Sequence, residues 1–310
     1  MQGPSPQGHQ SIAQFKIAPI NYFTVRDLGR TCPGTPSAAW LPVHDGGVPT
    51  IVFVHAHPDD EASQTSGSMA RAAAEGHRVV VVFATNGDHG EAPDDLAEGE
   101  TVVDRRRREA QVSAEVLGVH RVVWLGYADS GMTGWEQNHD PRSFFLSDLD
   151  EAAGRLARLL DEEGADVVVG YDWHGGYGHP DHVQVHRVLH RSVELAARRP
   201  RVLESTYNRD EMRRFAVAAK AAGEETWDVD EPMDDGNPLG EPESAIHWRV
   251  DVSPWIERRR ASLQAHISQT TDVGMMLSMP PEVFAVFFGH EHYIEPGREP
   301  GMVEAWPFGD

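Results

Sequence analysis

The sequence predicts an α/β fold with a Rossmann-like, mostly parallel sheet flanked by helices. Short apolar runs recur at 50–54, 78–84, 121–125 and 166–170, and the valine-rich run at 78–84 is typical of a strand buried on both faces. Segments with helical periodicity separate these runs, at 62–75, 103–117 and 149–163. Helical connections of this length join parallel strands through right-handed crossovers, which gives the predicted class.

The remaining elements follow the same alternation. Gly118 directly after the second helical segment is a plausible C-cap. The pattern then predicts a helix at 183–198, a strand at 201–207, a helix at 210–222, a strand at 247–252 and a helix at 254–269. Residues 1–49 are rich in Pro, Gly, Ser and Gln, so we expect a partly disordered N-terminal extension before one domain at 50–310.

Composition limits the partners of this chain. The 310 residues include 49 Asp+Glu against 27 Lys+Arg, a formal net charge of -22, which argues against nucleic acid or an anionic membrane as partner. Cys32 is the only cysteine, so an intrachain disulfide and a cysteine-based zinc site are excluded. The N-terminus lacks a secretory pattern and no stretch approaches the length of a membrane span, so we expect a cytoplasmic protein. Assembly into a homo-oligomer is compatible with this composition.

The stretch 54–61 holds the first cluster of chemical groups. It follows the first predicted strand and precedes a helix, so it lies at the carboxyl end of a strand, where ligands bind in such sheets. Pro58 restricts the backbone there, and His57 and Asp60 can converge on one divalent ion while Asp59 acts on a bound water. The alternative for this stretch alone is a solvated acidic loop that caps the helix N-terminus.

The stretch 171–182 holds the second cluster, at the end of the fourth predicted strand. It repeats the order His-Pro-Asp, and His182 at the start of the next helix is the expected third ligand. Either loop alone is weak evidence. Because the fold brings equivalent strand ends together, the two loops form a stronger pair.

These residues carry a family resemblance. The motifs at 56–61 and 178–182 resemble the paired motifs of the PIG-L/LmbE-like zinc-dependent N-deacetylases, which hydrolyse the N-acetyl group of N-acetylglucosamine-containing molecules. The resemblance covers roughly 50–295. Within the family it is strongest to mycothiol-pathway enzymes, the N-acetylglucosaminyl-inositol deacetylase and the mycothiol conjugate amidase, through residues 129–132, 175–182, 265–269 and 291–293.

The resemblance implies a metal centre and a base. By likeness to the family, His57, Asp60 and His182 hold one Zn²⁺ per chain and Asp59 is the general base. Two histidines and one carboxylate leave a coordination position open, as in catalytic zinc sites. Amide hydrolysis needs an activated water, a stabilised oxyanion and a proton for the departing amine, and this set of groups can provide them.

The resemblance also implies further site residues. Tyr177 assists at the carbonyl oxygen, and His179 is a second acid or an electrostatic group, with Asp181 expected to orient it. Arg106 and Asp129 are expected to contact sugar hydroxyls. In the related enzymes the C-terminal part, here about 200–310, roofs the site. The alternative for His179 is a loop histidine that is hydrogen-bonded only to the backbone. The alternative for Tyr177 is a side chain that only packs against its neighbours.

The predicted function is removal of an N-acetyl or N-acyl group from an N-acetylglucosamine-type amino sugar conjugate, a small-molecule substrate. Alternatives within the family are a mycothiol S-conjugate amidase and a deacetylase of secondary metabolites such as aminoglycosides or glycopeptides. The acidic stretch 224–243 favours a cationic aglycone if it borders the cleft, although such stretches usually serve solubility. A nucleotide-binding Rossmann module is disfavoured because His-Pro-Asp-Asp stands where glycines are needed. A non-catalytic zinc- or sugar-binding relative is disfavoured by Asp59 and Tyr177.

Overall fold

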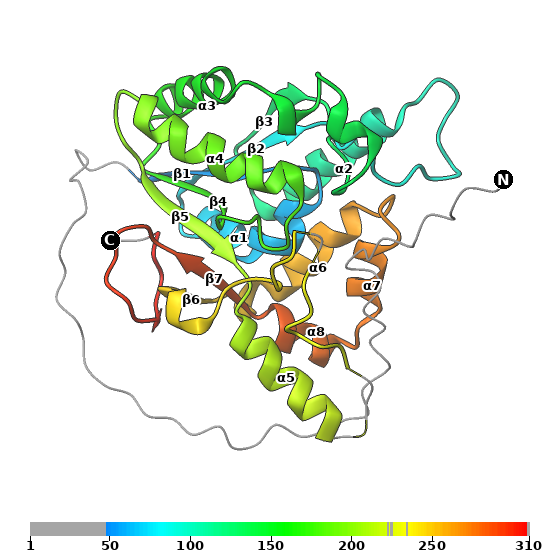
Figure 1. The fold of residues 1–310 in the computed structure, drawn as a ribbon, viewed down its shortest axis with the longest axis vertical. Coiled ribbons are helices and arrows are strands. Elements are labelled where there is room, and N and C mark those ends of the chain that lie inside the picture. The colour runs from blue at the N-terminus through cyan, green and yellow to red at the C-terminus, as the bar shows by residue number, and fades with distance from the viewer. Residues whose placement is uncertain (1–47, 222, 224–225, 234, 309–310) are drawn as a thin grey trace.

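The computed structural model describes residues 48–308 except 222, 224–225 and 234, so the predicted N-terminal extension lies almost wholly outside the described residues. Within these residues, eight strands form one sheet in the order β3-β2-β1-β4-β5-β7-β6-β8 (Figure 1). The first five strands are parallel: β1 (Thr50–His55), β2 (Arg78–Thr85), β3 (Arg121–Tyr127), β4 (Val167–Tyr171) and β5 (Arg201–Thr206). The predicted Rossmann-like, mostly parallel sheet is therefore confirmed.

The C-terminal strands continue this sheet. β7 (His290–Ile294) is antiparallel to both β5 and β6 (Trp248–Asp251), and the short β8 (Val303–Glu304) is parallel to β6. The antiparallel direction of β7 ends the Rossmann-like alternation of parallel strands and helices. The strands β5 to β8 of the segment expected to roof the site thus belong to the sheet.

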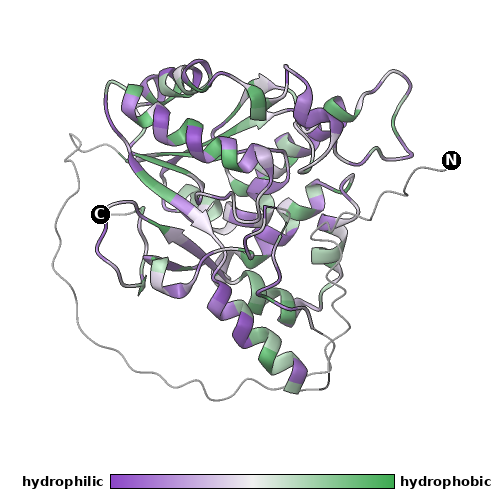
Figure 2. Cartoon of the chain, viewed as in Figure 1, coloured by the Kyte–Doolittle hydropathy of each residue, from purple (hydrophilic) through white to green (hydrophobic). Residues whose placement is uncertain are grey.

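Helices cover both faces of the sheet. α3 (Leu149–Glu163) and α4 (Pro180–Leu195) pack on one face, where Leu156 and Val185 join the alternate residues of the central strands in one core cluster. α1 (Ser66–Ala74) and α2 (Val102–Leu117) pack on the other face, and α6 (Ile256–Ala265) lies against both of these helices. The strands of the centre are mostly hydrophobic, while the helices mix hydrophobic and hydrophilic residues (Figure 2).

Element boundaries agree closely with the pattern where amphipathicity is strong. α3 has the predicted bounds, and α2 ends at Leu117, followed by Gly118, whose φ of 78° is the left-handed conformation that a glycine C-cap adopts readily. α5 (Arg209–Ala221) follows β5 as expected. The helix predicted at 183–198 begins three residues earlier at Pro180, because proline suits the first helical turn.

The sequence reasoning missed two short helices. α7 (Asp272–Ser278) and α8 (Pro281–Phe288) follow α6, which ends at Ala265 rather than at the predicted residue 269. Val273 and Phe284 from these helices pack with Ala62 and Leu263 in a third core cluster. No helix within the described residues has the length and apolar character to cross a membrane.

The strand order places the two chemical loops next to each other. From β1 the chain moves outward to β2 and β3, and then returns to place β4 on the other side of β1. This reversal between β1 and β4 is a topological switch point, where such sheets open a crevice at the carboxyl ends of the strands. The loops at 56–60 and 172–179 leave β1 and β4 at this crevice.

Candidate active site

The loop after β1 contains an unusual backbone conformation at Asp59. Its φ of 110° is the only positive value at a non-glycine residue within the described ranges. Side chains rarely adopt such a conformation, and residues held in it cluster at functional sites. The carbonyl of Asp59 accepts hydrogen bonds from the N–H groups of Ala62 and Ser63, both at 3.0 Å. The strained residue therefore starts the π-helical turn at Glu61–Thr65 that leads into α1.

The three predicted metal ligands lie together. Asp60 Oδ2 lies 3.3 Å from His57 Nδ1 and 3.3 Å from His182 Nε2. All three residues are buried, and His182 comes from the first turn of α4. The spatial pairing of the two loops, on which the sequence argument depended, is present.

The orientation of the His182 ring is fixed by its second nitrogen. Nδ1 lies 3.1 Å from the carbonyl oxygen of Gly175, which can only accept a hydrogen bond, so Nδ1 carries the proton. The lone pair of Nε2 then faces Asp60, as in histidines that bind metals. A Cβ on Gly175 would lie 2.3 Å from the Cβ of His182, so only glycine lets this backbone approach the ring.

His57 is held in the same way by carboxylates. Its Nε2 lies 3.2 Å from Asp181 Oδ2 and 3.6 Å from Asp129 Oδ1, while Nδ1 faces Asp60. Burial opposes a charged imidazole, but Asp129, Asp181 and Asp60 outweigh burial and raise the pKa of His57 well above its usual range. The negative charge of the three carboxylates favours a cation at this place. A divalent metal ion can balance that charge, as a proton on His57 does in its absence.

Asp60 is ionised in this environment. Burial would favour the neutral acid, but His182 and His57 hold the pKa of the Asp60 carboxyl well below its usual range. The buried His57 and His182 also form a compact donor group with His179, and His57 forms another with Asp129 and Asp181. The donor set therefore fits a zinc ion at the His57–Asp60–His182 position, with further donors close to it.

The expected pairing of Asp181 with His179 is wrong in detail. The Asp181 carboxylate contacts His57 and accepts hydrogen bonds from the backbone N–H and the hydroxyl of Ser130. Only the backbone N–H of Asp181 reaches His179, where it donates to Nδ1 at 3.1 Å because His179 is the N-cap of α4. Burial lowers the pKa of His179 to about 3. Asp181 thus orients a candidate ligand rather than the neighbouring histidine.

Two tyrosines flank His182. The Tyr177 hydroxyl lies 3.4 Å from His182 Nε2, one of the predicted ligand atoms. Tyr171, which the sequence analysis did not single out, donates to Asp60 Oδ2 at 2.9 Å and stacks on the His182 ring with a centroid distance of 4.2 Å. Its position as the last residue of a buried strand, directly before the second loop, is the signal that could have identified it.

The two predicted substrate-binding residues lie beside these groups and already have protein partners. Arg106 is buried and donates to Asp59 Oδ2 at 3.0 Å, to Gly87 O at 2.8 Å and to the carbonyl of Pro58. Asp129 accepts from the backbone N–H of Gly131 at 2.8 Å in addition to its contact with His57. Burial raises the pKa of Asp59 to about 6, although the positive charge of Arg106 opposes the rise.

A buried network behind Asp59 also escaped the sequence reasoning. One oxygen of Glu61 lies 2.5 Å from the Ser113 hydroxyl and 2.6 Å from His266 Nε2, and the other accepts the backbone N–H of Asp59 at 2.9 Å. His266 had entered only as part of the resemblance. The network ties the loop after β1 to the C-terminal segment after α6, and no local pattern predicts such a long-range pair.

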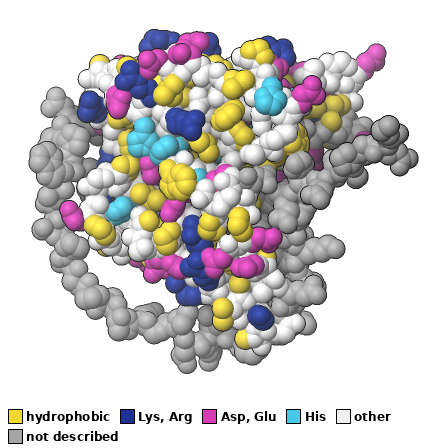
Figure 3. All heavy atoms as spheres, in the orientation of Figure 1, with side chains coloured by type: hydrophobic (Ala, Val, Ile, Leu, Met, Phe, Trp, Pro, Cys, Tyr) yellow, Lys and Arg dark blue, Asp and Glu magenta, His cyan; other side chains and the backbone are white. Residues whose placement is uncertain are grey.

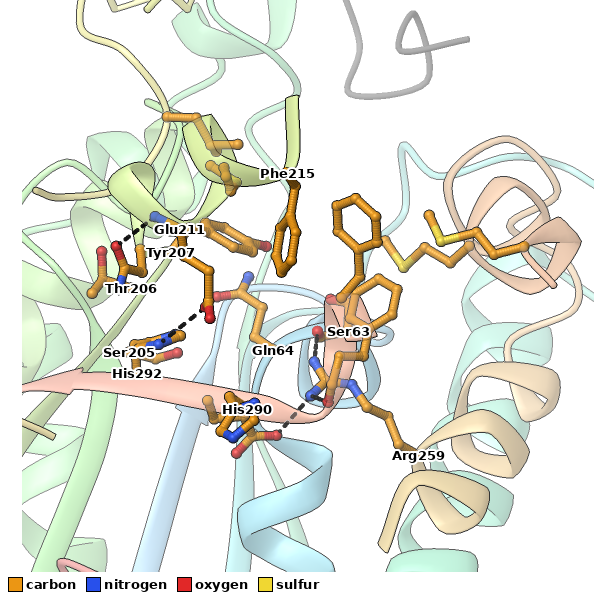
Figure 4. Close-up of a pocket in the computed structure, with 18 of the residues that line it drawn as sticks. Ser63, Gln64, Ser205, Thr206, Tyr207, Glu211, Phe215, Arg259, His290 and His292 are labelled. Carbon is orange, nitrogen blue, oxygen red and sulfur yellow. Dashed lines mark hydrogen bonds and ion pairs between the residues drawn. The ribbon is translucent and has the colours of Figure 1, made fainter. Parts of the chain in front are cut away.

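A separate cavity of about 160 Å³ opens between the turn after Glu61, β5, α5, α7, α8 and β7 (Figure 4). Ser63 and Gln64 line one side, and Tyr207 stands opposite, with its ring 3.2 Å from the place of a Cβ on Gly176 in the second loop. Most of the remaining lining is apolar: Met212, Phe215, Trp227, Leu239, Met275, Met276, Met279, Phe287 and Phe288. The cavity does not include the three predicted ligands.

The fold and the site define a class of protein. A histidine–carboxylate centre at the switch point of a Rossmann-like sheet, with a further carboxylate beside it, is suited to metal-assisted hydrolysis. A family model described as PIG-L, GlcNAc-PI de-N-acetylase, matches residues 52–193. The chain belongs to the PIG-L family of deacetylases, as its two His-Pro-Asp motifs predicted.

Relatives cover most of the chain. The 1D-myo-inositol 2-acetamido-2-deoxy-alpha-D-glucopyranoside deacetylase of Thermobifida fusca (strain YX) is 36% identical over 278 residues, covering 82% of this chain and 96% of that protein. The protein of the same name from Acidothermus cellulolyticus is 34% identical over 258 residues, covering 80% and 88%. The predicted likeness to the N-acetylglucosaminyl-inositol deacetylase is thus confirmed. The N,N'-diacetylchitobiose deacetylase from Pyrococcus horikoshii shares the fold, with a TM-score of 0.51, 20% identity and coverage of 79% and 82%.

Proposed function

We propose that this deacetylase uses a single catalytic zinc ion, held by His57, Asp60 and His182, to hydrolyse the N-acetyl group of an N-acetylglucosaminyl conjugate. The observation that carries the proposal is the convergence of His57 Nδ1 and His182 Nε2 on Asp60, with the outer nitrogen of each ring facing an acceptor. That arrangement leaves two nitrogen lone pairs and one carboxylate directed at the same point.

The residues around this point can divide the reaction between them. Bound there, zinc would polarise the amide carbonyl and lower the pKa of a water molecule to about 7. Asp59 accepts the proton of the attacking water, and Arg106 holds its carboxylate in position at 3.0 Å. Tyr177, with its hydroxyl 3.4 Å from His182 Nε2, donates to the developing oxyanion. Asp59 then returns the proton to the departing amine, while His179 stands beside the ligand set as an electrostatic group.

The relatives support an inositol conjugate as the first substrate candidate. Both are named as deacetylases of a 2-acetamido-2-deoxy-glucopyranoside of myo-inositol, at identities of 34% and 36% over most of the chain. Asp129 and Arg106 lie beside the ligand set through their contacts with His57 and Asp59, so we propose them as the residues nearest to the sugar hydroxyls.

A second candidate is supported by the apolar cavity beside the turn after Glu61. Its aromatic and methionine lining suits a conjugate with an apolar group, such as the S-substituent of a thiol conjugate, better than a polyol.

A third substrate candidate, a cationic amino sugar, also has support. Asp235 lies 3.3 Å from His174 Nδ1, and Gly240 N–H donates to Gly176 O at 2.7 Å, so the acidic segment borders the second loop. A cationic amino sugar therefore belongs in the same comparison.

The test is acetate release by the zinc-loaded protein from three amides: N-acetylglucosaminyl-inositol, a thiol conjugate with an apolar substituent, and a cationic N-acetylated amino sugar. We expect the highest kcat/KM with the inositol conjugate, and a kcat about 10²–10⁴-fold lower in the Asp59→Asn variant. Preference for the thiol conjugate would support the second candidate. If none of the three is deacetylated while a simple peptide amide is cleaved, the amino-sugar proposal is wrong.

A further inference from the structure

A second group of metal-ligating side chains lies outside the active site. His186 and His190 stand one helical turn apart on α4, and Glu204 projects toward them from β5. One ligand atom from each of the three residues lies within 4.8 Å of the others. Figure 3 shows histidine side chains gathered on the face of the molecule where α4 and β5 lie. The three residues take no part in the reaction described above.

The tautomer of His186 is fixed by the backbone. Its Nδ1 lies 3.1 Å from the carbonyl oxygen of Tyr171, which fixes the proton on Nδ1 and leaves the Nε2 lone pair for another partner. Gly175 fixes the Nδ1 proton of His182 in the same way. There Nε2 faces Asp60, whereas the His186 nitrogen that lies near Glu204 is the protonated Nδ1 itself. A backbone carbonyl at the end of β4 thus pre-sets the tautomer that a metal ion requires.

The other two donors already contact each other. His190 Nε2 lies 2.7 Å from Glu204 Oε1, and His186 Nδ1 lies 3.6 Å from the same oxygen. The Glu204 side chain is 9% exposed, whereas those of His186 and His190 are 20% and 37% exposed. A nearly buried carboxylate is therefore joined to solvent through two imidazoles, which gives an ion both an anionic partner and a path of entry.

We propose that His186, His190 and Glu204 form a second zinc site, distinct from the catalytic centre. Two imidazoles at i and i+4 of a helix together with one carboxylate are a common ligand set for zinc, with water in the fourth position. Ligand atoms in a tetrahedral zinc site lie about 3.3 Å apart, given metal–ligand bonds of about 2.0–2.1 Å. The present separations are 2.7 Å for one pair and within 4.8 Å overall, and metal binding requires the His186 ring to turn so that Nε2 replaces Nδ1 beside Glu204 Oε1.

The proposed site has a structural role because it lies on the helix that presents His182. His182, His186 and His190 follow one another at intervals of four, so they share one face of the helix. An ion bound to the last two and to Glu204 fastens this face to β5, two turns after the active-site ligand. The proposed effect is to stabilise the helix that presents His182, without contact with substrate.

Metal stoichiometry tests the proposal directly. The full-length protein is stripped with a chelator, titrated with Zn²⁺ against a chromophoric competitor, and compared with variants of each centre. We expect two zinc ions per chain in the unchanged protein, one in His190→Ala, one in Glu204→Gln, one in His57→Ala, and none in His57→Ala combined with Glu204→Gln. His190 is partly exposed and Glu204→Gln preserves shape, so both variants are expected to fold.

Matched controls separate this site from general surface binding. His139→Ala removes an exposed histidine, and Glu194→Gln removes an exposed carboxylate of α4; both should still bind two ions. Thermal denaturation gives a second readout: excess zinc should raise the melting temperature of His57→Ala but not of its Glu204→Gln double variant. The proposal is overturned if the unchanged protein binds a single ion, or if Glu204→Gln and His190→Ala bind as many ions as the unchanged protein.

Discussion

Arg106 and Asp59 form an ion pair at 3.0 Å in which the arginine side chain is only 3% exposed and the aspartate 23%. The same guanidinium also binds the carbonyl groups of Pro58 and Gly87, so it joins the loop after β1 to the loop after β2. Asp59 carries the positive φ of 110°, and this clamp is what holds its carboxylate in place. The candidate base is thus positioned from behind, while its remaining surface is open to solvent.

Replacing the base should separate metal binding from turnover. Asp59→Asn keeps the size and the hydrogen bond from Arg106 but cannot accept the proton of water. We expect kcat to fall by about 10²–10⁴-fold, the range for loss of general acid–base catalysis, while zinc remains bound. Acetate release and elemental analysis of the same preparation measure the two effects. A fully active Asp59→Asn protein would remove Asp59 from the mechanism.

Loss of a candidate ligand should affect the metal first. His182→Ala removes the Nε2 donor that faces Asp60, and we expect most of the affinity of the catalytic site to disappear. Tyr177→Phe keeps all three donors, so it should bind zinc normally and lose only part of its kcat. Zinc affinity measured in both variants separates the two roles. Unchanged zinc affinity at the catalytic site in His182→Ala would show that the ligand set is misassigned.

The sequence predicted the parts of the site that are local in the chain. The segment from His57 to Asp60 lies within one turn, and strand periodicity placed it at the carboxyl edge. The position of His182 followed from the pairing of two strand ends, which the parallel topology imposes. Spacing and the fold class were enough to place these residues near one another, while their roles as ligands and base came from the family resemblance.

The sequence could not predict which side chains meet across the sheet. Asp181 stands two residues from His179, so the expected pair was the local one, yet its carboxylate turns toward His57, 124 positions earlier. The contact of Glu61 with His266 spans 205 positions. Such pairs depend on the packing of α6 and the loops, for which a single sequence carries no periodic signal.

The corrected position of Asp181 leads to its own prediction. Because its carboxylate contacts His57 Nε2 at 3.2 Å, Asp181→Asn should weaken zinc binding by about 10–100-fold, the usual cost of losing a partner of a metal-bound histidine. His179 makes no such hydrogen bond to His57 Nε2, so His179→Gln should lower zinc affinity much less. A competition titration with a chromophoric chelator measures both. Equal affinities in Asp181→Asn and the unchanged protein would contradict this positioning role.

A buried ion pair at the N-terminus of α1 should contribute strongly to stability. Glu291 and Arg259 are 2% and 3% exposed at the side chain and lie 3.0 Å apart. Glu291 also accepts the backbone N–H groups of Gly67 and Ser68 at 2.9 and 3.0 Å. Glu291→Ala leaves the arginine buried without its partner, so we expect a loss of about 3–5 kcal/mol in the free energy of unfolding.

The surface pair between Arg71 and Glu75 serves as the comparison for Glu291→Ala. Removing Glu75, whose side chain is 36% exposed, should cost about 1 kcal/mol or less. Urea denaturation of both variants gives the two values. Similar losses would show that the Arg259–Glu291 pair is not a buried anchor of the fold.

The last prediction concerns pH and His292, a buried residue of β7. Burial is the main reason that the pKa of His292 falls from 6.5 to about 3, and the positive charge of Arg249 adds to it, although Glu211 Oε2 at 3.4 Å acts in the opposite direction. The folded protein therefore keeps this ring neutral, while the unfolded chain binds a proton as the pH falls through about 6.5. The stabilising contribution of the neutral His292 ring is complete above pH 7 and decreases as the pH falls toward 3.

Between pH 7 and pH 5 the unfolding free energy of the unchanged protein should drop by up to about 2 kcal/mol more than that of His292→Gln, which cannot titrate. Urea denaturation at the two pH values measures this difference, and His139→Gln, which removes an exposed histidine, should retain the full pH dependence. Parallel pH profiles for the unchanged protein and His292→Gln would show that His292 is not the group responsible.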